Sequence, residues 1–235
     1  MRWNHRDRTL SRPCFLLAAA VIVIAGMVPI QAAQTDQPEQ NRWESAIRRF
    51  EVQDRRQAPT KGGILFVGSS SIVGWDVVKC FPDLPVINRG FGGSQIADSV
   101  HFADRIVLPY EPKIIVFYAG DNDIASGKSP QQVLADYKQF VETVHGRLPE
   151  TRIVYVAIKP SISRWKLVDR MRRANGLIRA VAEKDERLVF VDVDAPMIGD
   201  DGKPRGELFK PDGLHLNAEG YRLWSELVLP HLKLP

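Results

Sequence analysis

The chain has 235 residues, of which 44% are hydrophobic and 26% charged. This composition is typical of a globular protein rather than a disordered or fibrous one, and the length suits one α/β domain. The formal net charge is +4, but the first 33 residues hold four arginines and one aspartate, which leaves 28 basic and 27 acidic residues beyond them. A nearly neutral remainder without a basic block argues against a nucleic-acid partner.

The amino-terminal segment has the three-part layout of a secretory signal. Four arginines precede an uncharged apolar run from Phe15 to Val28, and small residues follow at Ala32 and Ala33. The run is 14 residues long, fewer than the roughly 20 that a membrane-spanning helix needs. We predict a signal peptide over residues 1–33 and export to the periplasm or the medium. Retention as an amino-terminal membrane anchor is the alternative.

Residues 34–60 are expected to form a tether followed by a helix. The first part of this region is polar, and the segment from Asn41 to Arg56 places Trp43, Ile47 and Phe50 on one face at roughly the 3.6-residue period of a helix. We expect this helix to lie across the outside of the domain.

Five short runs rich in β-branched and aromatic residues follow, and helical patterns separate them. The runs are Ile64–Val67, Val86–Asn88, Ile114–Tyr118, Ile153–Ile158 and Leu188–Val191. Strands that alternate with helices build a parallel sheet with helices on both faces. The sequence therefore predicts an α/β fold, a flavodoxin-like three-layer α/β/α sandwich with a five-stranded, mainly parallel sheet.

Three of the helical patterns have recognisable boundaries. One has Ser129 as its N-cap, Pro130 at its first position and Gly146 as its stop. Another runs from about Arg164 to Glu183, and the last begins at Asn217. Sheets of this kind bind ligands at the carboxyl ends of their strands, where we expect the functional site.

Four polar or glycine-rich segments lie at the carboxyl ends of predicted strands or in the last loop. They are Gly68-Ser69-Ser70-Ser71, Asn88-Arg89-Gly90-Phe91-Gly92-Gly93, Gly120-Asp121-Asn122-Asp123 and Asp212-Gly213-Leu214-His215. Each segment alone has an ordinary structural explanation, as a helix cap, a tight turn, a solvated loop or an exposed histidine. Together they hold the groups that acyl transfer requires.

Acyl transfer needs a nucleophile, a base, an acceptor that orients the base, and donors for the developing oxyanion. Ser70, His215 and Asp212 can fill the first three roles. The backbone N–H groups of Ser70 and Gly93 and the side-chain amide of Asn122 can fill the fourth. The missing side chain at Gly93 lets its backbone approach a substrate closely.

The four segments, in this order, resemble the four conserved blocks of the SGNH, or GDSL-type, hydrolases. The resemblance spans residues 62–230 and includes the Asn-x-Gly-x-Gly-Gly form of the branch of platelet-activating-factor acetylhydrolase catalytic subunits. It implies an SGNH hydrolase domain over residues 61–235. The implied site residues are the nucleophile Ser70, the oxyanion donors Ser70, Gly93 and Asn122, the base His215 and its partner Asp212.

One position departs from the family pattern. The first block of the family usually reads Gly-Asp-Ser, whereas Ser69 is the middle residue here. Three consecutive serines are therefore candidates, and Ser70 is assigned because it is second after Gly68, as in the family. The triad loses no member, because its acid is Asp212.

The resemblance implies an exported serine esterase that cleaves carboxylic esters, with short-chain or acetyl esters on carbohydrate or cell-envelope material as expected substrates. Lipase or thioesterase activity at the same site is an alternative, as is a catalytically silent carbohydrate-binding domain. A flavin-phosphate site at Ser69 to Ser71 would leave Asp212 and His215 unexplained. We predict no cofactor and no metal, and contact with a membrane only through an uncleaved amino-terminal segment.

Several other polar residues are candidates for supporting roles. Lys159, Ser161, Arg164 and Trp165 are expected either to line the substrate cleft or to form a solvated loop capped by a packed tryptophan. Arg89, Asp121 and Asp123 are candidate supports of the site. Two carboxylates without a nearby third ligand make a weak metal site, so we do not assign a metal to Asp121 and Asp123.

Overall fold

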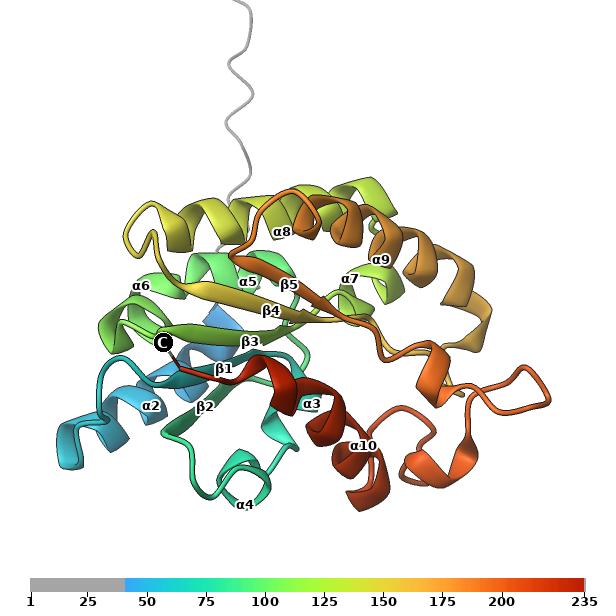
Figure 1. The fold of residues 1–235 in the computed structure, drawn as a ribbon, viewed down its shortest axis with the longest axis horizontal. Coiled ribbons are helices and arrows are strands. Elements are labelled where there is room, and N and C mark those ends of the chain that lie inside the picture. The colour runs from blue at the N-terminus through green and yellow to red at the C-terminus, as the bar shows by residue number, and fades with distance from the viewer. Residues whose placement is uncertain (1–40, 235) are drawn as a thin grey trace, which may run out of the picture. The chain divides into compact units, whose positions relative to one another are not determined.

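The computed structural model describes residues 41–234, so the predicted signal peptide and the start of the predicted tether lie outside the described residues. A parallel five-stranded sheet is at the centre (Figure 1). Its strands are β1 (Ile64–Gly68), β2 (Val86–Gly90), β3 (Ile114–Tyr118), β4 (Arg152–Val156) and β5 (Leu188–Val191), in the order β2-β1-β3-β4-β5. The predicted sheet is therefore confirmed, with β2 ending two residues later and β4 two residues earlier than expected.

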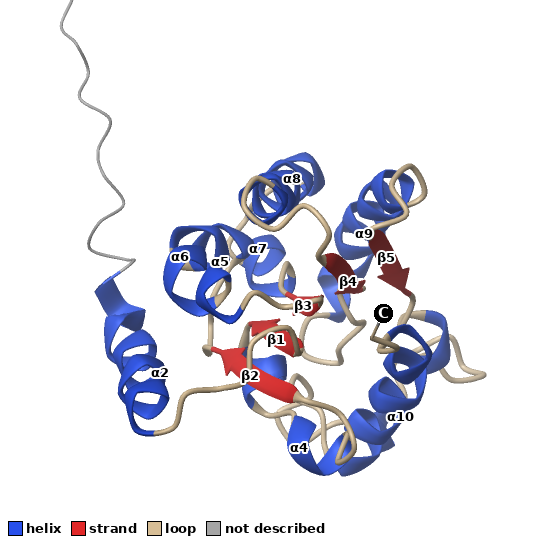
Figure 2. Ribbon diagram, turned by 60° about the vertical axis from the view of Figure 1, so that its left-hand side comes forward, coloured by secondary structure: helices blue, strands red, loops and turns tan. Residues whose placement is uncertain are grey.

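Helices cover both faces of the sheet, as Figures 1 and 2 show. One face carries α5 (Ile96–His101), α6 (Ala103–Ile106), α7 (Asp121–Ala125), α8 (Pro130–His145) and α9 (Val168–Ala182), and the other carries α3 (Ser70–Val73), α4 (Val77–Cys80) and α10 (Ala218–Val228). The predicted three-layer α/β/α sandwich is confirmed. None of the helices within residues 41–234 is long and apolar enough to cross a membrane.

Each strand contributes side chains to both hydrophobic layers because successive residues of a strand point to opposite faces. In β1, Leu65 and Val67 pack into the layer under α5 and α8, whereas Ile64 and Phe66 pack into the layer under α10. All five residues of β1 are buried, as expected for an interior strand of a parallel sheet that is covered on both faces.

The long helices follow their predicted signals closely. The Ser129 side chain accepts a hydrogen bond from the N–H of Gln132 and caps α8, which ends before Gly146. Asn217 caps α10 through the N–H groups of Glu219 and Gly220. The helix expected from Arg164 begins only at Val168, because residues 165–167 form a separate turn of 3₁₀ helix.

The helix α2 (Glu44–Arg56) is joined to the domain by packing and by charge. Ile47 is fully buried in the same hydrophobic layer as α5 and α8. Arg105 of α6 forms ion pairs with Glu44 at 2.7 Å and with Glu51 at 2.6 Å. The ion pairs with Arg105 attach the predicted helix to α6.

The strand order reverses between β1 and β3, since β2 lies on one side of β1 and the later strands on the other. Open α/β sheets bind their ligands at the carboxyl ends of the strands at such a reversal. Gly68 and Tyr118 are register partners at these ends. A Cβ atom on Gly68 would lie 1.8 Å from the Tyr118 carbonyl oxygen, so only glycine fits where the chain leaves β1.

Candidate active site

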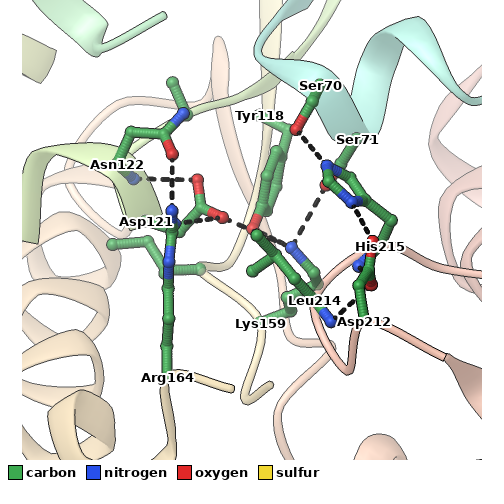
Figure 3. Close-up of polar contacts among 12 residues, drawn as sticks. Ser70, Ser71, Tyr118, Asp121, Asn122, Lys159, Arg164, Asp212, Leu214 and His215 are labelled. Carbon is green, nitrogen blue, oxygen red and sulfur yellow. Dashed lines mark hydrogen bonds and ion pairs between the residues drawn. The ribbon is translucent and has the colours of Figure 1, made fainter. Parts of the chain in front are cut away.

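Ser70 lies directly beyond the carboxyl end of β1, at the first position of α3. The backbone N–H of Ser69 donates to the Tyr118 carbonyl at 3.0 Å, which fixes the turn between strand and helix. The Ser70 Oγ atom lies 3.0 Å from Nε2 of His215, a residue 145 positions away in the sequence (Figure 3). The fold thus brings the predicted nucleophile within hydrogen-bond distance of the predicted base.

Asp212 holds His215 from the other side of the imidazole ring. Its Oδ2 atom lies 2.7 Å from Nδ1 of His215, and its Oδ1 atom accepts the backbone N–H groups of Leu214 and His215, both at 2.9 Å. These hydrogen bonds, the one from the His215 side chain first, hold the pKa of Asp212 well below its ordinary value. An ionised Asp212 favours a proton on Nδ1, which leaves Nε2 free to accept the Ser70 proton.

The Gly92-Gly93 turn passes directly beside Ser70. A Cβ atom on Gly92 would lie 3.9 Å from Cβ of Ser70. Gly93 has a φ of +76°, a left-handed conformation that favours glycine. Within residues 41–234, neither the backbone N–H of Ser70 nor that of Gly93 donates to a backbone oxygen of a turn or loop, and the first N–H groups of a helix have no partner within it. Both groups are therefore free to bind an oxyanion.

Asn122 enters from α7, beyond the carboxyl end of β3. Its Nδ2 atom donates to the Ser94 carbonyl at 3.0 Å, and its Oδ1 atom accepts from Arg164 at 2.9 Å. A primary amide has two N–H bonds, so one remains for a ligand. Ser70 at the start of α3, Gly93 in the turn after β2 and Asn122 in α7 all follow the carboxyl ends of strands at the same edge of the sheet.

Comparison with known sequences supports the interpretation of the four polar and glycine-rich segments as family motifs. Residues 68–223 match the GDSL-like lipase/acylhydrolase family. The chain belongs to this family. The matched region contains all four segments of the sequence analysis, and the resemblance to SGNH hydrolases is therefore confirmed.

Individual proteins and solved structures are similar to this chain over most of its length. Platelet-activating factor acetylhydrolase IB subunit alpha1 of Bos taurus is 28% identical over 200 residues, which are 82% of each chain. A solved structure from Streptococcus pneumoniae, 21% identical, has a TM-score of 0.72 and covers 84% of this chain and 97% of its own. A carbohydrate esterase family 3 structure from Talaromyces cellulolyticus, 15% identical, has a TM-score of 0.57 over 73% and 96%. At these identities the two structures establish the fold alone.

Ser69 takes the place of the usual aspartate in the first block of the family. It is fully buried, and its Oγ atom forms no hydrogen bond with any residue in the described part of the chain. Ser71 is also buried, and its hydroxyl accepts from Lys159 rather than from His215. Ser70 is thus the serine of this run whose hydroxyl bonds to His215.

A buried lysine lies beneath the site, and its contacts were not foreseen from the sequence. Lys159 Nζ donates to Oγ of Ser71 at 3.1 Å and to the Tyr118 hydroxyl at 3.0 Å, and it pairs with Asp121 at 3.4 Å (Figure 3). Burial lowers the pKa of Lys159, although the Asp121 carboxylate opposes this change. Asp121 is equally buried, but Lys159 and Arg164 outweigh that burial and keep its pKa low.

The loop after β4 contains both buried and exposed residues, so the expectation of a solvated loop holds only in part. Lys159 and Ser161 are buried, whereas Arg164 and Trp165 are partly exposed. Of these, Arg164 lies beside a predicted site residue, Asn122. The contacts of Lys159 and Arg164 join residues that are far apart in the sequence, so no local pattern predicted them.

Asp123 and Arg89 support different parts of the molecule. Asp123 accepts the backbone N–H of Ile96 at 3.3 Å and pairs with Lys128 at 3.2 Å, and burial raises its pKa to about 6 although Lys128 opposes this. It thus ties α7 to α5 near the site. Arg89 instead pairs with Asp54 of α2, so it attaches α2 to the sheet and does not contact a predicted site residue.

The three residues of the predicted triad do not line the cavity between α4 and α10. This cavity, of about 550 Å³, is lined by Phe81, Leu216, Tyr221 and other residues. The side chains of His215 and Asp212 are 34% and 49% exposed. Within residues 41–234, no group of three His, Cys, Asp or Glu side chains is arranged to hold a metal ion.

Proposed function

We propose that this protein is a serine esterase that hydrolyses carboxylic esters through an acyl-enzyme on Ser70. The observation that carries the proposal is the position of His215, whose two ring nitrogens lie 3.0 Å from Ser70 Oγ and 2.7 Å from Asp212 Oδ2. A nucleophile, a base and an oriented acid in this arrangement are the parts of a serine hydrolase triad. Membership of a lipase and acylhydrolase family agrees with this reaction class.

The reaction begins when Ser70 Oγ attacks the ester carbonyl and transfers its proton to Nε2 of His215. The carbonyl oxygen becomes an oxyanion, which the N–H groups of Ser70, Gly93 and Asn122 stabilise. The intermediate then collapses, and the leaving alcohol takes the proton from Nε2. A water molecule repeats the attack on the acyl-enzyme, gives its proton to the same nitrogen, and releases the carboxylic acid and free Ser70.

We infer short acyl esters, acetyl above all, as the substrates. The triad lies on an open surface, and the cavity of about 550 Å³ that could hold a long chain is lined by other residues. A relative named as an acetylhydrolase agrees with acetyl esters as substrates, and a neighbour named as a carbohydrate esterase agrees with esters on carbohydrate. With export through the segment 1–33, carbohydrate or cell-envelope esters become the expected natural substrates.

The proposal is tested with an organophosphonate probe and a series of chromogenic esters. Mass spectrometry of the labelled protein should find the probe on Ser70, and kcat/KM should fall from p-nitrophenyl acetate to the butyrate and octanoate esters. Acetylated glycans follow as natural candidates. An unlabelled Ser70 would favour a silent carbohydrate-binding domain, whereas rising kcat/KM with chain length would favour a lipase.

A further inference from the structure

The two oxyanion donors that do not come from Ser70 share one structural feature. Each N–H belongs to a planar amide group, and the oxygen of that same amide accepts a hydrogen bond from a side chain outside the four family segments. Because an amide group is planar, a donor that holds its oxygen also constrains the direction of its N–H on the opposite side. The direction of a donor matters because catalysis requires it to meet the developing oxyanion.

The first amide is the peptide group between Gly92 and Gly93, which carries the Gly92 carbonyl oxygen and the Gly93 N–H. In a trans peptide these two groups point in opposite directions, and the described chain has no cis peptide bond. Trp43 Nε1 donates to the Gly92 oxygen at 2.8 Å. The Gly93 N–H must therefore point away from Trp43.

Trp43 is itself firmly held. It is 7% exposed and packs edge-on against Phe91, with ring centroids 5.9 Å apart. The Arg42 guanidinium covers its ring at 3.9 Å. The next turn of the helix buries Ile47 completely. The 3₁₀ turn Asn41–Trp43, which leads into α2, thus supplies a firmly held donor to the turn that passes beside the nucleophile.

The second amide is the side chain of Asn122, which could in principle be turned by 180° to exchange its oxygen and nitrogen. Arg164 Nη2 lies 2.9 Å from Oδ1 of Asn122, and a guanidinium has donors only. The amide atom that faces Arg164 must therefore be the oxygen. Asp121 holds Arg164 in place through an ion pair of 3.0 Å.

We propose that Trp43 and Arg164 are positioning residues, which set the directions of the oxyanion N–H donors of Gly93 and Asn122. The inference rests on the proposed function, because an oxyanion hole has a role only in an acyl-transfer enzyme. It assigns a part in catalysis to the amino-terminal helix and to the loop after β4. Each residue acts through an amide, Trp43 through the Gly92 oxygen and Arg164 through the Asn122 oxygen.

Trp43→Phe tests the first donor, since it keeps a ring in the same place and removes only the indole N–H. With p-nitrophenyl acetate as substrate and the full chain as enzyme, we expect kcat to fall on the order of 10- to 100-fold, less than the roughly 10²- to 10³-fold loss when a donor is removed outright. KM should stay nearly unchanged, because the interaction forms in the transition state. The matched control is Trp224→Phe, which removes a buried indole that donates to Met197; its melting temperature should fall while kcat is kept.

Arg164 is tested by a double-mutant cycle with Asn122. Asn122→Ala should lower kcat by about 10²- to 10³-fold, and Arg164→Met by about tenfold or more. If Arg164 acts only through Asn122, the double variant should be no slower than Asn122→Ala alone. Arg164→Lys keeps a donor and should recover part of the activity that Arg164→Met loses.

The outcomes separate the inference from the function on which it rests. A wild-type protein that neither hydrolyses p-nitrophenyl acetate nor labels at Ser70 would overturn both. An active wild type in which Trp43→Phe and Arg164→Met keep full kcat would overturn the inference alone. Additive losses of Arg164→Met and Asn122→Ala would also overturn it for Arg164, because they would show an effect that bypasses the amide.

Discussion

The side-chain nitrogen of Lys159 lies 3.1 Å from the hydroxyl of Ser71, the residue that follows the proposed nucleophile. Lys159 is only 1% exposed, and a charged group taken out of water requires compensation. Asp121 provides the opposite charge at 3.4 Å and also pairs with Arg164 at 3.0 Å. One carboxylate therefore balances two cations beneath the candidate site.

This arrangement predicts that substituting Asp121 and substituting Lys159 lower the free energy of unfolding by different amounts. Asp121→Asn leaves Lys159 and Arg164 facing each other without an anion, and should lower the free energy of unfolding by about 3–5 kcal/mol. Lys159→Met should cost less, because Asp121 keeps Arg164 as its partner. Urea unfolding of both variants measures the difference. Equal costs would mean that Arg164 does not compensate Asp121.

The serine run predicts three different outcomes for alanine substitutions. Ser70→Ala should lower kcat by roughly 10⁵- to 10⁶-fold, as loss of the nucleophile does in another triad enzyme. Ser69→Ala and Ser71→Ala should keep activity within about tenfold, because neither hydroxyl contacts His215 in the described chain. Turnover of p-nitrophenyl acetate measures all three. An inactive Ser71→Ala with an active Ser70→Ala would move the nucleophile by one position.

Asp212→Asn should keep the shape of the last loop but remove the charge that orients His215. We expect a loss in kcat that approaches about 10⁴-fold, with a nearly unchanged melting temperature. Asp201→Asn is the matched control, because Asp201 is an exposed aspartate that accepts a backbone N–H two residues later, as Asp212 does. Near-normal turnover of a folded Asp212→Asn protein would leave the Ser70–His215 pair to act with another partner or alone.

The attachment of α2 should weaken in acid. Hydrogen bonds from Arg105 and then Arg48 lower the pKa of Glu44 from 4.5 to about 2, and Arg105 also lowers the pKa of Glu51. Because the folded state favours the ionised carboxylates, this stabilisation is complete above pH 4.5 and is lost as the pH falls toward 2.

Thermal unfolding of Arg105→Gln measures this contribution. Its melting temperature should lie below that of the wild type at pH 6, by a few degrees at most because the pairs are partly exposed. The difference should shrink as the pH falls below 4.5. Arg222→Gln, which breaks exposed pairs within α10, should change the melting temperature little. If the difference in melting temperature between the wild type and Arg105→Gln grew as the pH fell, the ion pairs of Arg105 would not be the source of this stabilisation.

Export predicts a shorter mature chain. Intact-mass measurement of protein from the periplasm or the medium should show a new amino terminus near Gln34. A full-length mass confined to the membrane fraction would instead support an uncleaved anchor.

The sequence by itself determined the five strands, the long helices and the four motif segments, because their signals are local. Ser129, Pro130 and Gly146 bound α8 through contacts within one helical turn of its ends. The alternation of strands and helices leads to one parallel sheet, and parallel strands bring their carboxyl ends to one edge. Ser70, Asn122 and their neighbours could therefore be assigned to one site before any distance was known.

Only the tertiary structure decided what orients that site. The bond from Trp43 to Gly92 joins residues 49 positions apart, and the one from Lys159 to Ser71 joins residues 88 apart. Neither helical periodicity nor a cap residue predicts these two hydrogen bonds. In the sequence alone, Trp43 is an ordinary tryptophan of a helical pattern and Lys159 an ordinary lysine of a loop. These contacts form only when packing fixes the distance between the segments. A hydrogen bond requires a donor–acceptor distance within a few tenths of an ångström, and the order of residues does not specify that distance.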